Sequence, residues 1–146
     1  MKRSLRSLVP LGLDGRRALV RVDFNCPLKD GIVTDATRIR ASLPTIMYLR
    51  EKGARVILLS HLGRPKGPDP KQSLAPCAAA LEQLLGAPVL FIPDPASPDA
   101  VTLTKRLPRG GVAVVENTRF YPGEEKNDPE TAKLFATLGD LYVNDA

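Results

Sequence analysis

Short apolar runs recur along the chain and alternate with longer amphipathic stretches. The run at 54–59 is almost continuously apolar, which is typical of a strand buried on both faces of a parallel sheet. The turn-forming pairs Asp14-Gly15 and Gly110-Gly111 stand just before two other runs. The pattern predicts strands over residues 17–22, 54–59, 88–92, 112–115 and 140–143.

An amphipathic stretch lies between each predicted strand and the next. Ser73, Ser97-Pro98 and Asp128-Pro129 are typical first residues of helices, and Gly53 and Gly86 stand where helices commonly end. These signals predict helices over residues 37–52, 73–85, 97–107 and 128–138.

Three points of local structure remain open or irregular. Pro44 interrupts the first predicted helix, so that either the helix kinks there or Ser42 caps a second helix. A polar loop with Asp30-Gly31 at its tip precedes that helix, and the proline-rich segment 63–70 is expected to be irregular.

Strict alternation of strands and helices predicts an α/β fold, a three-layer α/β/α Rossmann-like parallel sheet. The order of the strands in the sheet does not follow from the sequence. The chain ends at Asn144-Asp145-Ala146, directly after a strand and without a covering helix. We therefore expect residues 1–146 to be an N-terminal domain that is incomplete at its C-terminus.

The composition is that of an ordinary globular domain, with 43% hydrophobic and 25% charged residues in a chain of 146. No apolar run approaches the roughly 18 residues that cross a bilayer, and the first residues lack a secretory apolar region. Cys26 and Cys77 have no paired metal or redox spacing, which favours a reducing cytoplasm.

The net charge of +5 is not arranged as in a nucleic-acid-binding protein. Such a protein would carry a continuous basic stripe or stacking aromatic residues, and neither is apparent. Several arginines instead follow predicted strands, while most other basic residues are interpreted as solvated surface groups. Neither a nucleic acid nor a membrane is expected as a partner.

Three polar segments each follow a predicted strand. They are residues 21–25, 60–65 and 116–120, with the sequences Arg-Val-Asp-Phe-Asn, Ser-His-Leu-Gly-Arg-Pro and Glu-Asn-Thr-Arg-Phe. Ligands of parallel α/β sheets bind outside the carboxyl ends of the strands, so these segments predict one convergent cationic site. A phosphate ester is the expected ligand.

Four arginines and a histidine are the candidate cationic groups of this site: Arg21, Arg38, Arg64, Arg119 and His61. Guanidinium groups bind phosphate in bidentate geometry and stay charged. Any one of them alone is more simply a surface residue, and His61 alone a loop histidine. Their shared position after strands favours the common site.

The carboxylates and the missing motifs limit the chemistry. Asp23 and Asn25 are candidates to face the ligand, while Glu116 and Asp145 are ambiguous between ligand binding and orientation of an arginine. The sequence contains no nucleophile elbow, no Gly-x-x-x-x-Gly-Lys-Ser/Thr loop and no Gly-x-Gly-x-x-Gly after the first strand. A nucleotide, if one takes part, is expected to bind elsewhere.

Six segments together resemble the phosphoglycerate kinase family, in the order found in that family. They are residues 21–27, 37–41, 60–67, 116–120, 123–128 and 143–146. Cys26 stands where the family usually has a small aliphatic residue, and Thr118 where leucine is common.

The resemblance implies a glycolytic, two-domain kinase that transfers a phosphoryl group between 1,3-bisphosphoglycerate and ADP. Asp23 and Asn25 would bind the glycerate end of 3-phosphoglycerate, and Arg38 would be the catalytic residue near the transferred group. His61, Arg64 and Arg119 would hold the phosphate of the substrate. Backbone around Phe24, Leu62 and Gly63 would line the same pocket.

The resemblance also implies partners and location. Mg-ATP or ADP would bind to the C-terminal domain, which is absent from this chain, so the chain alone is expected to be inactive. The intact enzyme is expected to be a cytoplasmic monomer. Two alternatives are a non-enzymatic anion- or nucleic-acid-binding module and a partly disordered structural fragment.

Overall fold

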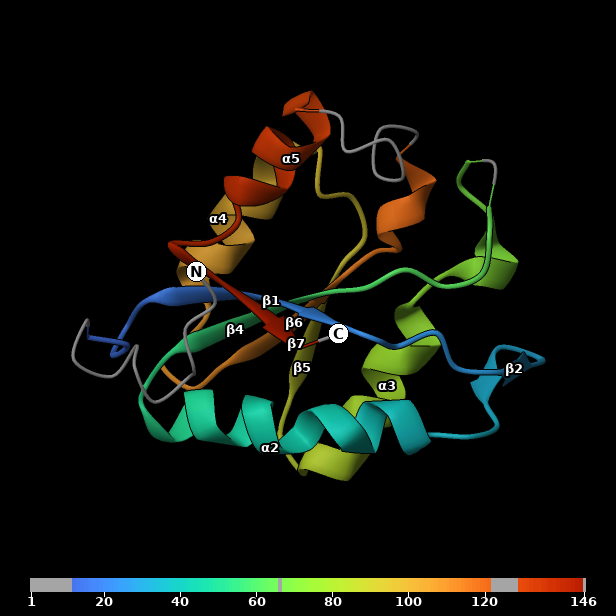
Figure 1. Ribbon diagram of the computed structural model, residues 1–146, viewed down its shortest axis with the longest axis horizontal. Coiled ribbons are helices and arrows are strands. Elements are labelled where there is room, and N and C mark those ends of the chain that lie inside the picture. Colours follow the sequence, from blue (N-terminus) through green and yellow to red (C-terminus); the bar gives the residue numbers. More distant parts are fainter. Residues whose placement is uncertain (1–11, 66, 122–128, 146) are drawn as a thin grey trace.

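A five-stranded parallel sheet forms the centre of the molecule (Figure 1). The computed structural model describes residues 12–65, 67–121 and 129–145. The strands run in the order β5-β6-β4-β1-β7. Their bounds are β1 Arg17–Val22, β4 Arg55–Leu59, β5 Val89–Ile92, β6 Val112–Val115 and β7 Leu141–Asp145.

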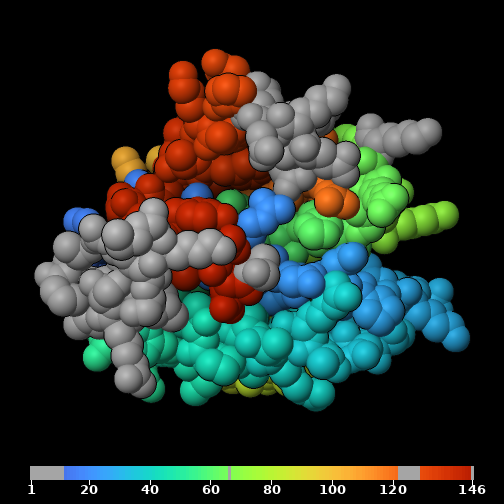
Figure 2. Space-filling model, viewed as in Figure 1, coloured from blue at the N-terminus to red at the C-terminus, as the bar shows by residue number. Residues whose placement is uncertain are grey.

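Among the described residues, two helices cover each face of the sheet, so the predicted three-layer α/β/α class is confirmed. α2 (Thr37–Glu51) and α3 (Ala75–Leu85) pack on one face, and α4 (Pro98–Arg106) and α5 (Pro129–Ala136) lie over the other. In the view of Figure 2, α2 covers the lower part of the molecule and α5 stands at its top.

Alternating residues of the central strands supply both cores. Ala18, Val20 and Val22 of β1 join the core beneath α2 and α3, while Leu19 joins the core beneath α4 and α5. Successive residues of a strand point to opposite faces of the sheet. A strand that is apolar at every position therefore has to be covered on both faces. The continuous apolar runs therefore explain why helices lie on both sides.

Helix ends follow the sequence signals in part. Ser97 accepts a hydrogen bond from the amide of Asp99 at 3.2 Å, and Gly86 closes α3 with φ +70°. α2 is one continuous helix with Pro44 inside it, and the Ser42 hydroxyl donates to the Ile39 carbonyl. The second-helix interpretation is therefore wrong, because Ser42 bonds backward within the same helix.

Other details differ from the sequence prediction. α3 begins at Ala75 with Leu74 as its N-cap residue, so Ser73, the predicted cap, lies one residue before the observed cap position. The Ser73 hydroxyl accepts from the Ala75 amide and donates to Glu116. The loop around Asp30-Gly31 contains a hairpin of β2 (Leu28–Lys29) and β3 (Ile32–Val33). Asp30 and Gly31 have φ values of +52° and +75°, as a tight hairpin turn requires. The predicted Asp128 cap lies outside the described residues.

The direction of the strand connections reverses between β4 and β6 at the carboxyl end of the sheet. The chain leaves β4 toward α3 on one face, and it leaves the neighbouring strand β6 toward α5 on the other. Such a reversal is where ligands of open α/β sheets bind. In the part of the chain that the structure describes, no helix has the length and apolar character needed to cross a membrane.

Candidate functional site

The three polar segments predicted to converge do so. β6, β4 and β1 are consecutive neighbours in the sheet, and the segments that follow them meet at one edge. Hydrogen bonds between side chains and backbone join each segment to the next. Their arrangement separates a buried part, between the β4 and β6 loops, from an exposed part between the β1 loop and α2.

The β1 loop is fastened to the β4 loop by two hydrogen bonds. The buried Ser60 hydroxyl accepts from the Phe24 amide at 2.8 Å, and the Asn25 side-chain oxygen accepts from the Gly63 amide at 2.9 Å. From below, the Cys77 thiol donates to the Phe24 carbonyl at 3.7 Å. The backbone N–H of Gly63 therefore fixes the orientation of the Asn25 side-chain amide at the site.

Two buried cysteine thiols, of Cys26 and Cys77, pack at this loop. Desolvation raises the pKa of Cys77 to about 12 and also raises the pKa of Cys26. A thiol reacts as its thiolate, and burial keeps both groups neutral near pH 7. Their role in the described structure is packing beneath the β1 loop.

Asn117 joins the β4 loop to the β6 loop. Its side-chain oxygen accepts from the amides of Leu62 (3.2 Å) and Arg119 (3.0 Å), and its nitrogen donates to the carbonyls of Leu62 (2.8 Å) and Gln72 (2.9 Å). Asn117 is 0% exposed. We call these contacts, with Gly63 and Glu116, the Asn117 junction.

Arg119 and Glu116 complete the Asn117 junction. The Arg119 guanidinium donates through Nη1 to the Gly63 carbonyl at 3.2 Å. Glu116 accepts from the amides of Leu74 and Asn117, both at 2.8 Å, and from the Ser73 hydroxyl at 2.7 Å. Glu116 was ambiguous from sequence; in the structure its carboxylate binds the start of α3.

Asp23 and Arg38 form the exposed part of the site. Arg38 Nη1 lies 3.0 Å from Asp23 Oδ1 and 3.1 Å from Oδ2. The two side chains are 52% and 46% exposed. Asp23 also accepts from the Asn25 amide at 3.0 Å, so it links the ion pair to the β1 loop.

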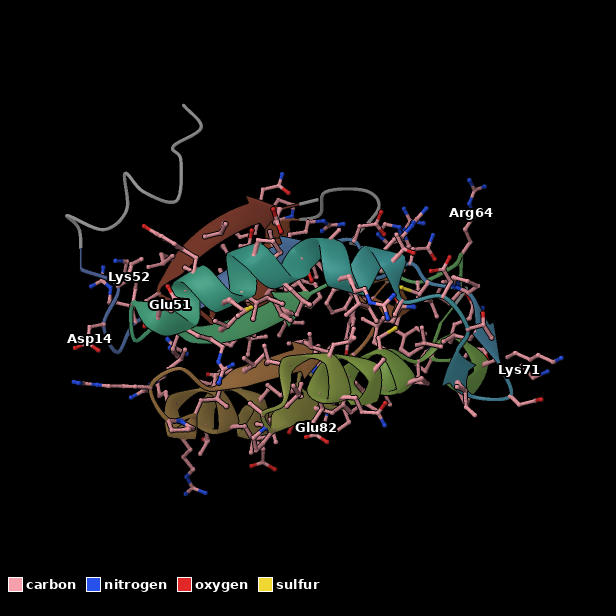
Figure 3. The ribbon with its side chains drawn as sticks, turned by 90° about the horizontal axis from the view of Figure 1, so that it is seen from below. Asp14, Glu51, Lys52, Arg64, Lys71 and Glu82 are labelled. Atoms are coloured by element: carbon pink, nitrogen blue, oxygen red, sulfur yellow. The ribbon has the colours of Figure 1, made fainter. Side chains whose placement is uncertain are left out.

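The remaining candidate residues, on the β4 loop, differ in how far they are buried. His61 is half-buried, Leu62 is buried and Arg64 is exposed. Figure 3 shows Arg64 extending away from the molecule, at the end opposite Asp14. The structure thus brings Asp23, Phe24, Asn25, Arg38, Leu62, Gly63 and Arg119 together, whereas the Arg64 side chain points outward.

Arg21 is a further candidate cation from the sequence. It lines a hollow of about 600 Å³ with Leu19, Leu59, Phe135 and Tyr142 on the α5 face of the sheet. Side chains alternate along a strand, so Arg21 lies on the same face of β1 as Leu19, and Val20 and Val22 lie on the opposite face. Arg21 thus lines this hollow, and its role as a cation of the site stays a prediction.

Sequence reasoning missed two buried residues of the site. Ser60 and Asn117 lie inside the segments that were singled out, but their partners are residues far away along the chain. The signal available was their type, since a polar residue at the end of an apolar strand must find partners if it is buried.

A family model described as phosphoglycerate kinase matches residues 8–146. The cytosolic phosphoglycerate kinase of Triticum aestivum is 56% identical over 146 residues, which are 99% of this chain and 36% of that protein. The phosphoglycerate kinase of Fervidobacterium nodosum is 56% identical over 135 residues, covering 92% of this chain and 34% of that protein.

A solved structure agrees with these sequence matches. The crystal structure of phosphoglycerate kinase from Pyrococcus horikoshii superposes with a TM-score of 0.84 at 36% identity, covering 95% of this chain and 36% of that one. The chain thus spans about a third of the length of the proteins that it matches.

Proposed function

This chain belongs to the phosphoglycerate kinase family, and we propose that it forms the N-terminal, 3-phosphoglycerate-binding domain of such an enzyme. The proposed reaction is reversible transfer of a phosphoryl group between 1,3-bisphosphoglycerate and ADP. The observation that carries the proposal is the convergence of three hydrogen-bonded strand ends, which bear Asp23 and Arg119, with Arg38 of α2 bonded to Asp23.

The buried part of the site suits a phosphate. Arg119 and His61 would hold the phosphate of the substrate, and the Leu62–Gly63 backbone would line the pocket. Arg64, whose side chain points outward in this structure, would join them by turning toward the phosphate. Arg119 already rests on the Gly63 carbonyl, so one guanidinium edge is oriented before a ligand arrives. An arginine held in this way loses little conformational entropy on binding, which favours affinity.

The exposed part suits the reacting end. Asp23 and Asn25 would bind the glycerate hydroxyl and carboxylate, and Arg38 would stabilise charge on the phosphoryl group during transfer. The carboxylate of 3-phosphoglycerate is itself an anionic nucleophile, so no general base is needed. In this account Arg38 exchanges its partner Asp23 for the phosphoryl oxygens when the substrates meet.

The sequence has no phosphate-binding glycine loop for a nucleotide. We assign the magnesium nucleotide, as the family resemblance implies, to a C-terminal domain of the intact enzyme, a cytoplasmic monomer that must close about a hinge. The 146-residue chain alone should transfer no phosphoryl group from ATP to 3-phosphoglycerate.

A two-dimensional amide NMR titration tests the proposal directly. The chain is titrated with 3-phosphoglycerate, and inorganic phosphate serves as the control ligand. We expect shifts near Asp23, Arg38, His61, Arg64 and Arg119 at lower concentrations of 3-phosphoglycerate than of phosphate. Dispersed peaks that ignore 3-phosphoglycerate would contradict the proposal.

A matched variant and a salt series separate specific binding from general anion attraction. Arg40 is exposed and lies two residues after Arg38 on α2. Arg40→Ala should leave the titration unchanged, whereas Arg119→Ala should weaken it. Equal responses to phosphate and 3-phosphoglycerate, or stronger binding of an oligonucleotide with steep salt dependence, would favour the non-enzymatic anion- or nucleic-acid-binding module.

A further inference from the structure

The side chain of Asn117 uses its whole hydrogen-bonding capacity inside the protein. A primary amide has two N–H donors and an oxygen that accepts two bonds. Both donors and both acceptor positions of Asn117 are occupied, by Leu62 twice and by Gln72 and Arg119 once each. Since the residue is 0% exposed, these bonds define a single orientation of the amide.

Two partners of Asn117 are backbone groups of the segments proposed to bind phosphate. One side of the amide holds both the N–H and the C=O of Leu62, directly before Gly63. The other holds the N–H of Arg119, whose guanidinium returns to the Gly63 carbonyl. A closed ring therefore runs from Asn117 through Leu62, Gly63 and Arg119 back to Asn117.

The ring is also anchored outside the site. The third partner, the Gln72 carbonyl, belongs to the 3₁₀ turn Pro70–Gln72 that leads into α3. The neighbouring Glu116 carboxylate accepts hydrogen bonds from the backbone N–H of Asn117 and from the backbone N–H of Leu74 at the start of α3. Movement of the ring would therefore break contacts on the core side as well as at the site.

We infer that Asn117 is a positioning residue for substrate phosphate, which fixes Arg119 and the Leu62–Gly63 backbone in binding geometry without itself touching the ligand. The inference rests on the proposed function, because it assumes that these groups bind the phosphate of 3-phosphoglycerate. Its ligand class is a phosphate monoester. Loss of the amide should loosen both the guanidinium and the backbone that surround the phosphate.

Asn117→Asp is the informative substitution. The carboxylate keeps an oxygen for Leu62 and Arg119, but it loses the two N–H donors to Leu62 and Gln72. We expect the affinity for 3-phosphoglycerate to fall about ten- to hundredfold, in line with a lost pair of buried hydrogen bonds. The chemical shifts of Gly63 and Arg119 should move in the absence of ligand.

Thr104→Val is the matched control. Thr104 is also 0% exposed, and its hydroxyl accepts from Arg17 at 3.0 Å and donates to the Val101 carbonyl at 2.7 Å. It lies on α4, which packs on the other face of the sheet from α2 and α3. Its loss should lower the unfolding midpoint as Asn117→Asp does and leave the affinity unchanged. Titrations are compared at a temperature where both variants remain folded.

The wild-type chain provides a measurement that needs no variant. The Asn117 side-chain N–H protons should give resolved signals that exchange slowly with solvent, both without ligand and at saturation with 3-phosphoglycerate. Exchange at the rate of a solvated amide would overturn the inference even if Asn117→Asp fails to fold.

The outcomes separate this inference from the proposed function. Weakened binding in Asn117→Asp but not in Thr104→Val, with slow side-chain exchange, supports the positioning role. If the wild type binds and folded Asn117→Asp binds equally well, only the positioning role is refuted. If the wild type does not bind 3-phosphoglycerate, the proposed function fails and this inference fails with it.

Discussion

The Asn117 junction and the Asp23–Arg38 pair serve the same candidate site but are built differently. The junction is largely buried, and it joins the Asn117 side chain, backbone amides and carbonyls, the Glu116 carboxylate and the half-buried Arg119 guanidinium through several short bonds. The Asp23–Arg38 pair is about half exposed on both sides. A buried network in which every member is bonded rigidifies its surroundings, whereas an exposed ion pair contributes about 0–1 kcal/mol.

The difference has a functional meaning for a phosphoryl-transfer site. A phosphate that stays on the substrate benefits from cations held in fixed positions. An arginine that must reach a group arriving from another domain needs a partner that it can leave at low cost. We therefore propose that the Asn117 junction anchors the phosphate of the substrate and that the Arg38 side chain moves during the reaction.

Removal of Arg38 should have the largest effect. In the full-length enzyme, Arg38→Ala should lower kcat about 10²–10³-fold, the range for loss of one group that stabilises developing charge, with a smaller change in the KM for 3-phosphoglycerate. Arg40→Ala, on the same helix, is the control and should behave as wild type. Near-normal turnover of Arg38→Ala would remove Arg38 from the catalytic role.

Ser60→Ala tests how much the buried fastening of the β1 loop contributes. The substitution leaves the Phe24 amide, which Ser60 binds at 2.8 Å, without this partner in the interior. The free energy of unfolding in urea should fall by about 1–3 kcal/mol. Thr34→Val removes an exposed hydroxyl that bonds to the Pro27 carbonyl and should change it by less than about 0.5 kcal/mol. Equal effects would mean that burial of this bond is not what stabilises the loop.

Cys77 under the same loop predicts a pH effect. Burial raises its pKa from 9.0 to about 12, so between these values the folded state keeps a proton that the unfolded state releases. This contribution to stability is complete below pH 9 and disappears as the pH rises toward 12. The stability difference between wild type and Cys77→Ala should shrink over that window in urea unfolding curves. A difference independent of pH would show that the thiol ionises normally.

Asp23→Asn should have the smallest effect on stability. The pair with Arg38 is exposed and accessible to salt, so the free energy of unfolding should change by less than about 0.5 kcal/mol. Binding of 3-phosphoglycerate should nevertheless weaken, because the variant loses the carboxylate proposed to bind the glycerate end. A loss of stability as large as that of Ser60→Ala would end the contrast between the two parts of the site.

Much of the fold follows from the sequence because its signals are local. Continuous apolar runs imply coverage on both faces, and Ser97 and Gly86 mark helix ends through their own backbone chemistry. The order β5-β6-β4-β1-β7 is not local, since an apolar run does not specify its neighbour. The hairpin at Asp30-Gly31 was missed because each of its strands has only two residues.

The site divides in the same way. Convergence of the strand ends follows from parallel topology, and the family resemblance is confirmed by the match over residues 8–146. The importance of Asn117 was not foreseen, because its partners Leu62 and Gln72 are 55 and 45 residues away along the chain. Strand alternation places Arg21 on the face of β1 that carries Leu19, which the apolar pattern of the run alone does not reveal. The binding and catalytic roles of all the candidate site residues, His61 and Arg64 included, stay predictions.

A crystal structure of the chain with 3-phosphoglycerate tests the central claim most directly. We predict that the Asn117 junction keeps its hydrogen bonds and its backbone positions, while the Arg38 guanidinium separates from Asp23 as the glycerate end binds. Rearranged β4 and β6 loops around an intact Asp23–Arg38 pair would contradict the assignment of the fixed and moving parts.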